Sequence, residues 1–321
     1  MFNKYSERMS IYKYARGTKI SLIIFFLMGI CVTVSAQQDP MFTQYMHNPV
    51  SINPAYAGSR GTLNIVGMHR QQWVGIDGAP KTLALSINSP FIKYNVGIGF
   101  TLLYDQLGPT KQTGLFGDYS YHLKIKNKTK LALGLKAGIS IIEKDLNNLI
   151  HYNEDDYLAM NGYQKLYLPN FGLGTYLYSD RYYLGLSIPK LLQNSLSDNS
   201  NTLVSKEKRH YFVTGGVVFD MTENIKFKPS TTLRIVKGSP VSTELSLAVL
   251  LQERLWFGAM YRLGDALGAL VKIDLSKELS IGYSYDYTLS KLGVYSQGTH
   301  EIYISFDFVR KGRKILSPRY F

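Results

Sequence analysis

The clearest fold signal is the segment Leu131-Ala-Leu-Gly-Leu-Lys-Ala-Gly-Ile-Ser-Ile141, in which large aliphatic residues alternate with Ala, Gly, Lys and Ser. A period of two places the two sets of side chains on opposite faces of a β-strand. Segments with one oily face and one small or polar face recur along the chain. This pattern predicts a sheet closed into a barrel whose outer face contacts lipid.

Alternation predicts fourteen strands. Their expected ranges are 62–72, 80–89, 93–104, 112–124, 129–142, 168–178, 181–189, 208–220, 224–236, 240–251, 254–263, 266–275, 278–288 and 299–309. Carboxylates such as Asp286 and Glu301 fall on the face opposite Tyr285 and Ile302, which agrees with the cost of placing a charge against lipid. The expected fold is therefore all-β, an outer-membrane antiparallel β-barrel of about 14 strands.

The lengths of the predicted connections also favour an outer-membrane barrel. Short turns follow the even-numbered strands, whereas the long connections 143–167, 190–207 and 289–298 follow odd-numbered strands. Bacterial outer-membrane barrels have short periplasmic turns and longer outer loops, so both termini are expected inside. A soluble exported β-sandwich used for adhesion is the alternative fold, and it gives no reason for this parity.

The N-terminal segment has the features of a secretory signal peptide. Five basic residues precede an apolar run over 20–34, and cleavage is expected between Ala36 and Gln37. The run is shorter than the roughly 18 to 20 residues of a membrane-spanning helix. The predicted organisation is a signal peptide at 1–36, an irregular periplasmic lead-in at 37–61, a transmembrane barrel at 62–309 and a basic periplasmic tail at 310–321.

Charge and cysteine content narrow the function classes. Removing five basic residues and Glu7 with the signal lowers the formal charge from +13 to +9. Basic residues are scattered rather than gathered on a helix, so nucleic acid is not an expected partner. The only cysteine, Cys31, lies in the signal, so the mature chain is expected to lack a thiol.

Motifs along the mature chain resemble those of the type IX secretion system membrane protein PorP/SprF family. They are QQDPMFTQYMHNPVSINPAYAGSRG (37–61), MHRQQWVGIDGAPKT (68–82), GDYSYHL (117–123), LPNFGLGTYL (168–177), YYLGLSIPKLL (182–192) and SPRYF (317–321). The resemblance implies an outer-membrane barrel that is needed for export or surface attachment of large cargo proteins, such as gliding adhesins. The signal peptide predicts that the barrel itself is exported through the general secretory pathway. The resemblance implies two partner classes besides outer-membrane lipid: cargo with a C-terminal sorting domain, and other secretion components in the periplasm or outer membrane. It implies no catalysis.

Three sets of residues are candidate contact sites. A plug and its barrel-side contact are expected at Asn53, Pro54, Tyr56, Gly58, Arg70, Gln72 and Trp73, with Arg70 bonded to backbone carbonyls and Trp73 near an interface; a simple structural clasp is the alternative. Cargo docking is expected on apolar loop residues Tyr152, Tyr157, Leu158, Met160, Tyr163, Leu191 and Leu192, with packing of loop on loop as the alternative. The tail residues Arg310, Lys311, Arg313, Lys314 and Arg319 are expected to meet a periplasmic component or anionic headgroups, or simply to be solvated.

Catalytic, cofactor and metal sites are not expected. The six histidines show no metal-ligand spacing, and neither HExxH nor CxxC occurs. The pairs Gly97 with Gly99 and Gly172 with Gly174 lie inside alternating strands, where they are expected as small inward residues or bend points. A general diffusion porin or small-solute channel remains the alternative function, because inward Gly and Ser residues leave room for a lumen.

Overall fold

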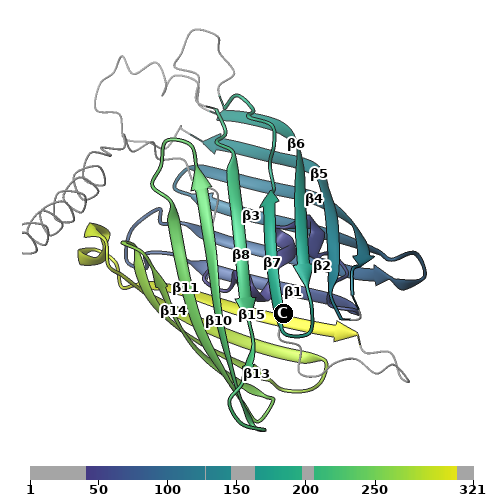
Figure 1. The fold of residues 1–321 in the computed structure, drawn as a ribbon. Coiled ribbons are helices and arrows are strands. Elements are labelled where there is room, and N and C mark those ends of the chain that lie inside the picture. Colours follow the sequence, from purple (N-terminus) through teal and green to yellow (C-terminus); the bar gives the residue numbers. More distant parts are fainter. Residues whose placement is uncertain (1–40, 127, 146–162, 197–205, 309–321) are drawn as a thin grey trace, which may run out of the picture. The chain divides into compact units, whose positions relative to one another are not determined.

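The computed structural model describes residues 41–126, 128–145, 163–196 and 206–308. The barrel belongs to one compact unit, residues 37–237 and 241–321. A single antiparallel sheet closes on itself where β15 pairs with β1 (Figure 1). Its strands are β1 (Leu63–Gln71), β2 (Lys81–Phe91), β3 (Val96–Leu107), β4 (Thr110–Lys124), β5 (Lys130–Asp145), β6 (Tyr163–Tyr178), β7 (Tyr182–Ile188), β8 (His210–Val217), β9 (Phe219–Asp220), β10 (Ile225–Val236), β11 (Ser242–Leu251), β12 (Leu255–Arg262), β13 (Ala266–Asp274), β14 (Leu279–Thr288) and β15 (Thr299–Phe308).

The barrel wall has fourteen strand positions, as the alternation predicts. β8 and β9 together fill one of them, because both pair with the same neighbour, β10. The ladder is interrupted at Val218, beside Pro229 of β10. Proline has no backbone N–H to donate, so a gap in the ladder is expected there. The Val218 N–H instead donates to the Arg181 carbonyl on the other side, at 2.8 Å.

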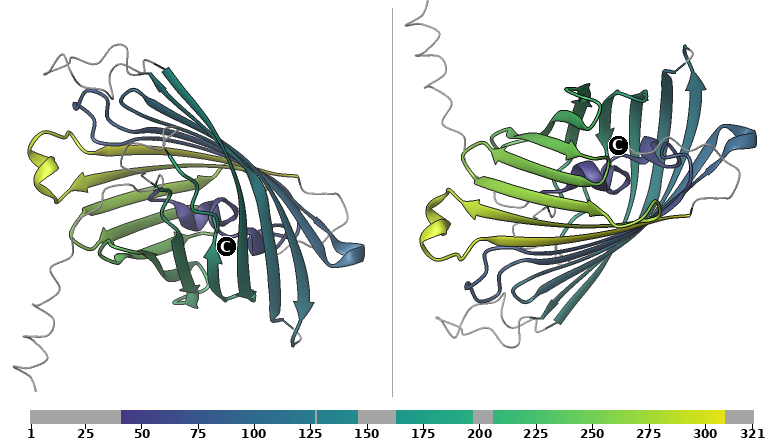
Figure 2. Two further views of the ribbon diagram at one scale, coloured as in Figure 1. Left: turned by 90° about the horizontal axis from the view of Figure 1, so that it is seen from above. Right: turned by 90° about the horizontal axis from the view of Figure 1, so that it is seen from below.

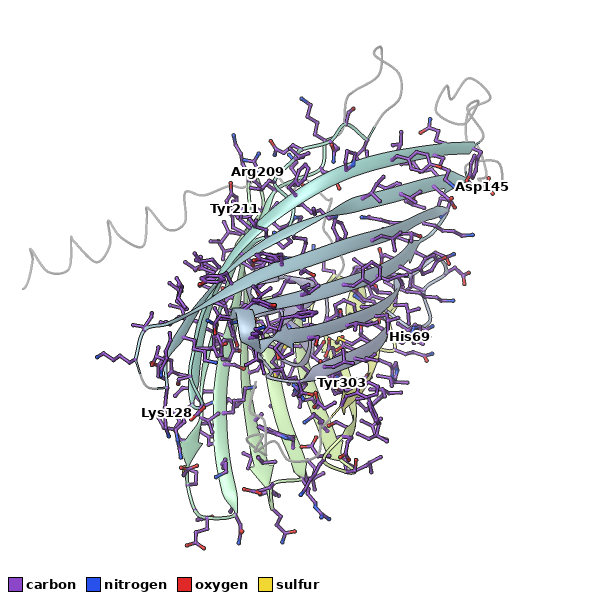
Figure 3. All side chains as sticks on the ribbon, turned by 90° about the vertical axis from the view of Figure 1, so that its right-hand side faces the viewer. His69, Lys128, Asp145, Arg209, Tyr211 and Tyr303 are labelled. Carbon is purple, nitrogen blue, oxygen red and sulfur yellow. The ribbon has the colours of Figure 1, made fainter. Side chains whose placement is uncertain are left out.

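The alternation in β5 sorts side chains as the sequence predicts. Leu133 and Leu135 are 45% and 55% exposed, whereas Ala132 and Lys136 are buried on the inner face. The same division is visible in Figure 3, where Tyr303 lies within the barrel and Tyr211 lies on its outer face. The exposed aliphatic and aromatic rows form the surface expected to meet lipid, and the protein is an outer-membrane barrel.

The two ends of the barrel differ in their connections. Lys128, between β4 and β5, lies at one end, and Asp145, at the end of β5, lies at the other (Figure 3). All connections at the Lys128 end, called the turn end, are short; the connections 72–80, 146–162, 189–209 and 289–298 lie at the opposite, loop end. Short turns are periplasmic in bacterial barrels, so the loop end is expected to face outward.

Strand boundaries differ most from prediction at the loop end. β5 and β6 extend to Asp145 and back to Tyr163, which shortens the expected 143–167 connection. β3 and β4 continue to a two-residue turn at Gly108 and Pro109, where Gly108 has a φ of 54°. In both hairpins the backbone pairing extends beyond the residues that alternate between apolar and polar. The alternation alone therefore does not predict where the strands end. Among the described residues, no helix has the length and apolarity needed to cross a membrane.

Candidate functional site

Residues 41–61, which the sequence predicts as part of an irregular periplasmic lead-in, occupy the inside of the barrel because their apolar side chains are buried against the wall. Residues 41–61, called the plug, contain three short 3-10 helices, η1 (Tyr45–His47), η2 (Pro49–Ser51) and η3 (Pro54–Tyr56). Both end-on views show this purple segment enclosed by the strands (Figure 2). Its apolar side chains are buried against inward residues of the wall in two clusters. One joins Phe42, Tyr45 and Ile52 to Val66, Met68, Ala84, Phe212 and Tyr303, and the other joins Val50, Ala55, Tyr56 and Ala57 to Ala132 and Tyr176.

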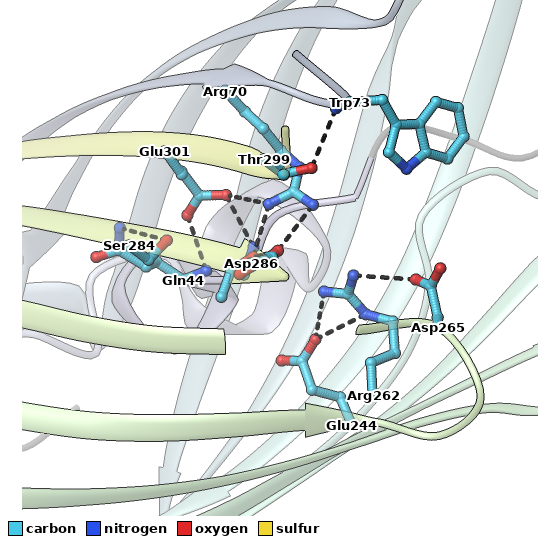
Figure 4. Close-up of polar contacts among 12 residues, drawn as sticks. Gln44, Arg70, Trp73, Glu244, Arg262, Asp265, Ser284, Asp286, Thr299 and Glu301 are labelled. Atoms are coloured by element: carbon cyan, nitrogen blue, oxygen red, sulfur yellow. Dashed lines mark hydrogen bonds and ion pairs between the residues drawn. The ribbon is translucent and has the colours of Figure 1, made fainter. Parts of the chain in front are cut away.

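An ionic clamp holds the plug near the loop end. Arg70 of β1 donates to the Thr43 hydroxyl at 2.6 Å, to Glu301 Oε2 at 3.0 Å and to Asp286 Oδ2 at 3.1 Å (Figure 4). Glu301 also accepts the backbone N–H groups of Thr43 and Gln44, at 2.8 and 2.9 Å. The clamp, defined as Arg70, Asp286 and Glu301, therefore binds plug backbone and side chain together.

A second ionic cluster lies close to the clamp in the same view. Arg262 of β12 donates to Glu244 Oε2 at 2.7 and 3.1 Å and to Asp265 Oδ2 at 3.3 Å (Figure 4). Arg262 and Glu244 are buried. Charges removed from water are tolerated only when paired, so these contacts indicate a lumen with matched charges at this level.

The plug is also fixed at the turn end. Arg60 forms a two-pronged ion pair with Asp307, with nitrogen–oxygen distances of 2.9 Å on both prongs. The Ala57 carbonyl accepts from the Ser120 hydroxyl at 2.6 Å and contacts His122 Nε2 at 2.9 Å. Contacts at both ends make the plug an integral part of the barrel interior.

Glycines in the wall let the plug backbone approach. A Cβ on Gly134 would lie 2.1 Å from Ala55 N, and one on Gly97 would lie 2.0 Å from Ala57 O. A Cβ on Gly174 would lie 2.1 Å from Asn53 Oδ1. Side chains do not fit at such distances. These inward glycines make close packing with the plug possible.

The surroundings of His47 in the plug shift the pKa of its imidazole. Burial lowers the pKa of His47 well below its ordinary value, and the positive charges of Lys272, Lys228 and Arg60 lower it further. Its Nε2 is buried and has no hydrogen-bond partner among the described residues. The imidazole is therefore neutral in the folded protein at neutral pH. Within the ranges that the structure covers, no three His, Cys, Asp or Glu side chains gather in a way that would bind a metal ion.

A family comparison covers the plug and nearly the whole barrel. The model of the type IX secretion system membrane protein PorP/SprF family matches residues 34–306. The chain belongs to this family. The matched range includes residues 41–61 and the clamp residues.

The other comparisons are with curated proteins and with solved structures. No curated protein matches the chain. Solved structures with a similar backbone include Omp33, an outer membrane protein of Acinetobacter baumannii. Its TM-score is 0.46 and its sequence identity 8%, over 77% of this chain and 98% of that chain. The NanC porin has TM-score 0.41 and 10% identity over 77% of this chain and 100% of that chain.

The structure separates the predicted plug contacts into two groups. Asn53, Pro54, Tyr56 and Gly58 lie in the plug, and Asn53 Nδ2 donates to the Thr175 carbonyl of β6 at 3.0 Å. Arg70 contacts the plug, but through two carboxylates and a hydroxyl rather than the expected backbone carbonyls, because a buried guanidinium is best stabilised by charged acceptors.

The remaining two predicted residues belong to the 72–80 loop. The Gln72 N–H donates to the Pro80 carbonyl within that loop, at 2.9 Å. The Trp73 N–H donates to Thr299 Oγ1 at 3.2 Å, while its ring points away from the clamp (Figure 4). Trp73 has a φ of 49°, so this residue marks a tight bend in the loop.

The predicted loop and tail sites are described only in part. Tyr152, Tyr157, Leu158 and Met160 lie outside the described residues, as do Ala36, Gln37 and the tail residues Arg310, Lys311, Arg313, Lys314 and Arg319. Tyr163 is the first residue of β6 and is 56% exposed. Leu192 is 41% exposed and Leu191 is half-buried. Docking on these side chains stays a prediction.

Sequence reasoning missed the acidic half of the clamp. Asp286 and Glu301 were assigned correctly to the inner face, but a pattern along one strand does not show which inward charges meet across the lumen. For Gly97 and Gly174 the sequence predicts only small inward residues or bend points, whereas the structure shows that they give room to the plug. Arg70, Asp286 and Glu301 all face inward in the sequence pattern, but only the strand register shows that they are close enough to form an ionic cluster.

Proposed function

We propose that this barrel acts without catalysis in type IX secretion, supporting the export or cell-surface attachment of specific large secreted proteins such as gliding adhesins. The family match over residues 34–306 carries the proposal. The proposed partners are cargo with a C-terminal sorting domain at the loop end, and secretion components in the periplasm or outer membrane.

The filled lumen supports this role over that of a diffusion channel. The plug buries Phe42, Val50 and Ala55 and is bonded at both ends of the barrel. A barrel with its interior occupied by the plug is suited to present its loops to a protein partner. Binding rather than conduction is the function that this interior supports.

A deletion strain tests the proposal. Proteomics of the cell surface and the culture medium is expected to show loss or mislocalisation of one or a few large proteins with C-terminal sorting domains, restored by the wild-type gene. An unchanged profile of large surface proteins would sink the secretion role for this chain. Total-cell levels of the same proteins serve as the control for expression.

A further inference from the structure

The barrel wall contains a break between β6 and β7. These strands pair only from Leu173↔Ile188 to Tyr178↔Tyr183, although β6 begins at Tyr163. Pro189 follows β7 and has no N–H with which to continue the ladder. Over the described part of the chain, no strand pairs with residues 163–172 of β6 on this side.

Separate hydrogen bonds rather than a continuous ladder close the break. The Leu191 N–H donates to the Phe171 carbonyl of β6 at 2.8 Å, and the other bonds involve side chains. Asn170 of β6 donates from Nδ2 to the Leu192 carbonyl at 3.0 Å and accepts the Leu192 N–H at 2.9 Å. Glu207 Oε2 accepts from Asn170 at 3.3 Å and from Asn194 at 2.9 Å. These side-chain bonds form a polar latch, defined as Asn170, Asn194 and Glu207, in place of a paired strand, and segments without a continuous ladder open locally more readily than paired strands.

The chain after β7 turns inward at the break. A Cβ on Gly172 would lie 2.4 Å from the Pro189 carbonyl oxygen, so Pro189 crosses over the inner face of β6. Pro189 and Lys190 consequently line the lumen instead of completing the wall. Gly172 is the residue that makes this crossing possible.

An apolar cavity lies directly behind the break. Its volume is about 60 Å³, and besides Pro189 and Lys190 it is lined by Phe42 and Ile52 of the plug and by Phe116 and Phe212 of the wall. Small cavities with such lining exclude water and accept apolar groups. Outside the break, Phe171 and Leu186 are 56% and 48% exposed on the lipid-facing surface.

We propose that the break at Pro189 is a lateral portal through which an acyl chain passes from the bilayer into this cavity. The latch opens, the chain end enters between β6 and the 189–192 segment, and the aromatic rings surround it. Acyl chains are the apolar groups that adjoin the portal on the membrane side. The cavity, the latch and the lipid-facing surface all adjoin the break beside Pro189.

Photo-crosslinking tests the portal with the full chain. The protein is reconstituted in vesicles of phosphatidylethanolamine and phosphatidylglycerol that contain either a phospholipid or palmitic acid with a diazirine at the chain end. Adducts on Phe42, Phe116 or Phe212 are expected, and the arm that gives them identifies membrane lipid or free fatty acid as the source. Adducts confined to outward residues such as Leu186 would overturn the proposal.

A disulfide lock separates the portal from other routes. The variant Asn170→Cys with Leu192→Cys places two thiols at positions that are hydrogen-bonded through the Asn170 side chain and the Leu192 backbone, and the mature chain is expected to hold no other thiol. Lumen adducts are expected to disappear when the disulfide forms and to return on reduction, while outward adducts stay constant. Lumen adducts that persist with the disulfide formed would contradict lateral entry. If the pair does not fold, Leu103→Trp fills the cavity instead, because Leu103 of β3 also lines it. Unchanged lumen adducts in that variant also contradict the proposal.

Discussion

At the scale of single residues, Arg70 stabilises the plug at the loop end. It neutralises Glu301 and Asp286, which are both buried. Arg70→Met leaves two buried carboxylates without their cation, and removing one partner of such a pair costs roughly 3–5 kcal/mol. The expected result is a clearly lower thermal unfolding midpoint of the purified barrel.

The matched control for this prediction is Arg254→Met. Arg254 lies in the exposed turn between β11 and β12. Substitutions at such surface positions usually change stability by no more than about 0.5 kcal/mol. Equal unfolding midpoints for the Arg70 and Arg254 variants would mean that the clamp does not stabilise the plug.

His47 makes stability depend on pH. Its lowered pKa in the folded state means that only the unfolded imidazole takes up a proton near its ordinary pKa of about 6.5. Stability from this group is therefore complete above about pH 6.5 and falls as the pH drops towards the lowered folded-state pKa. As the pH is lowered from 8 to 5, we expect the thermal unfolding midpoint of the wild type to fall more steeply than that of His47→Gln. Parallel pH profiles would contradict this.

At the scale of elements, the fit between plug and wall depends on the inward glycines. Gly134→Ala places a Cβ 2.1 Å from the Ala55 backbone, so the plug has to shift. Trypsin is then expected to cut faster after Arg60, which pairs with Asp307 in the native barrel. Gly67→Ala is the control, because nothing lies within 4 Å of that Cβ. Equal cleavage rates in both variants would show that close approach at Gly134 is not needed.

The strands were predictable because their signal is local. Alternation in β5 fixes its inner and outer faces without reference to any other strand, and the turn parity fixes its direction. The plug carries no period, and its burial depends on contacts with residues more than two hundred positions away, such as Glu301. Its motif predicted a contact with Arg70, but the clamp's carboxylates become visible only with the register of β14 and β15.

At the scale of the whole molecule, the plug has a direction. Thr43 is bonded near the loop end and Arg60 near the turn end, so the chain passes through the lumen between them. A cysteine at Met41 is therefore expected to react with a membrane-impermeant maleimide on intact cells. A cysteine at Arg254, in a turn-end connection, should react only after permeabilisation. Labelling of both positions only after permeabilisation would contradict this direction.

Single-channel conductance of the purified protein in planar lipid bilayers tests the central claim, that the barrel is filled by its own residues 41–61. The plug is bonded to wall strands at both ends and packs against glycines between them. Wild-type protein is therefore expected to insert without large, steady current steps. Large, steady single-channel currents from wild-type protein would show an open lumen and contradict the account.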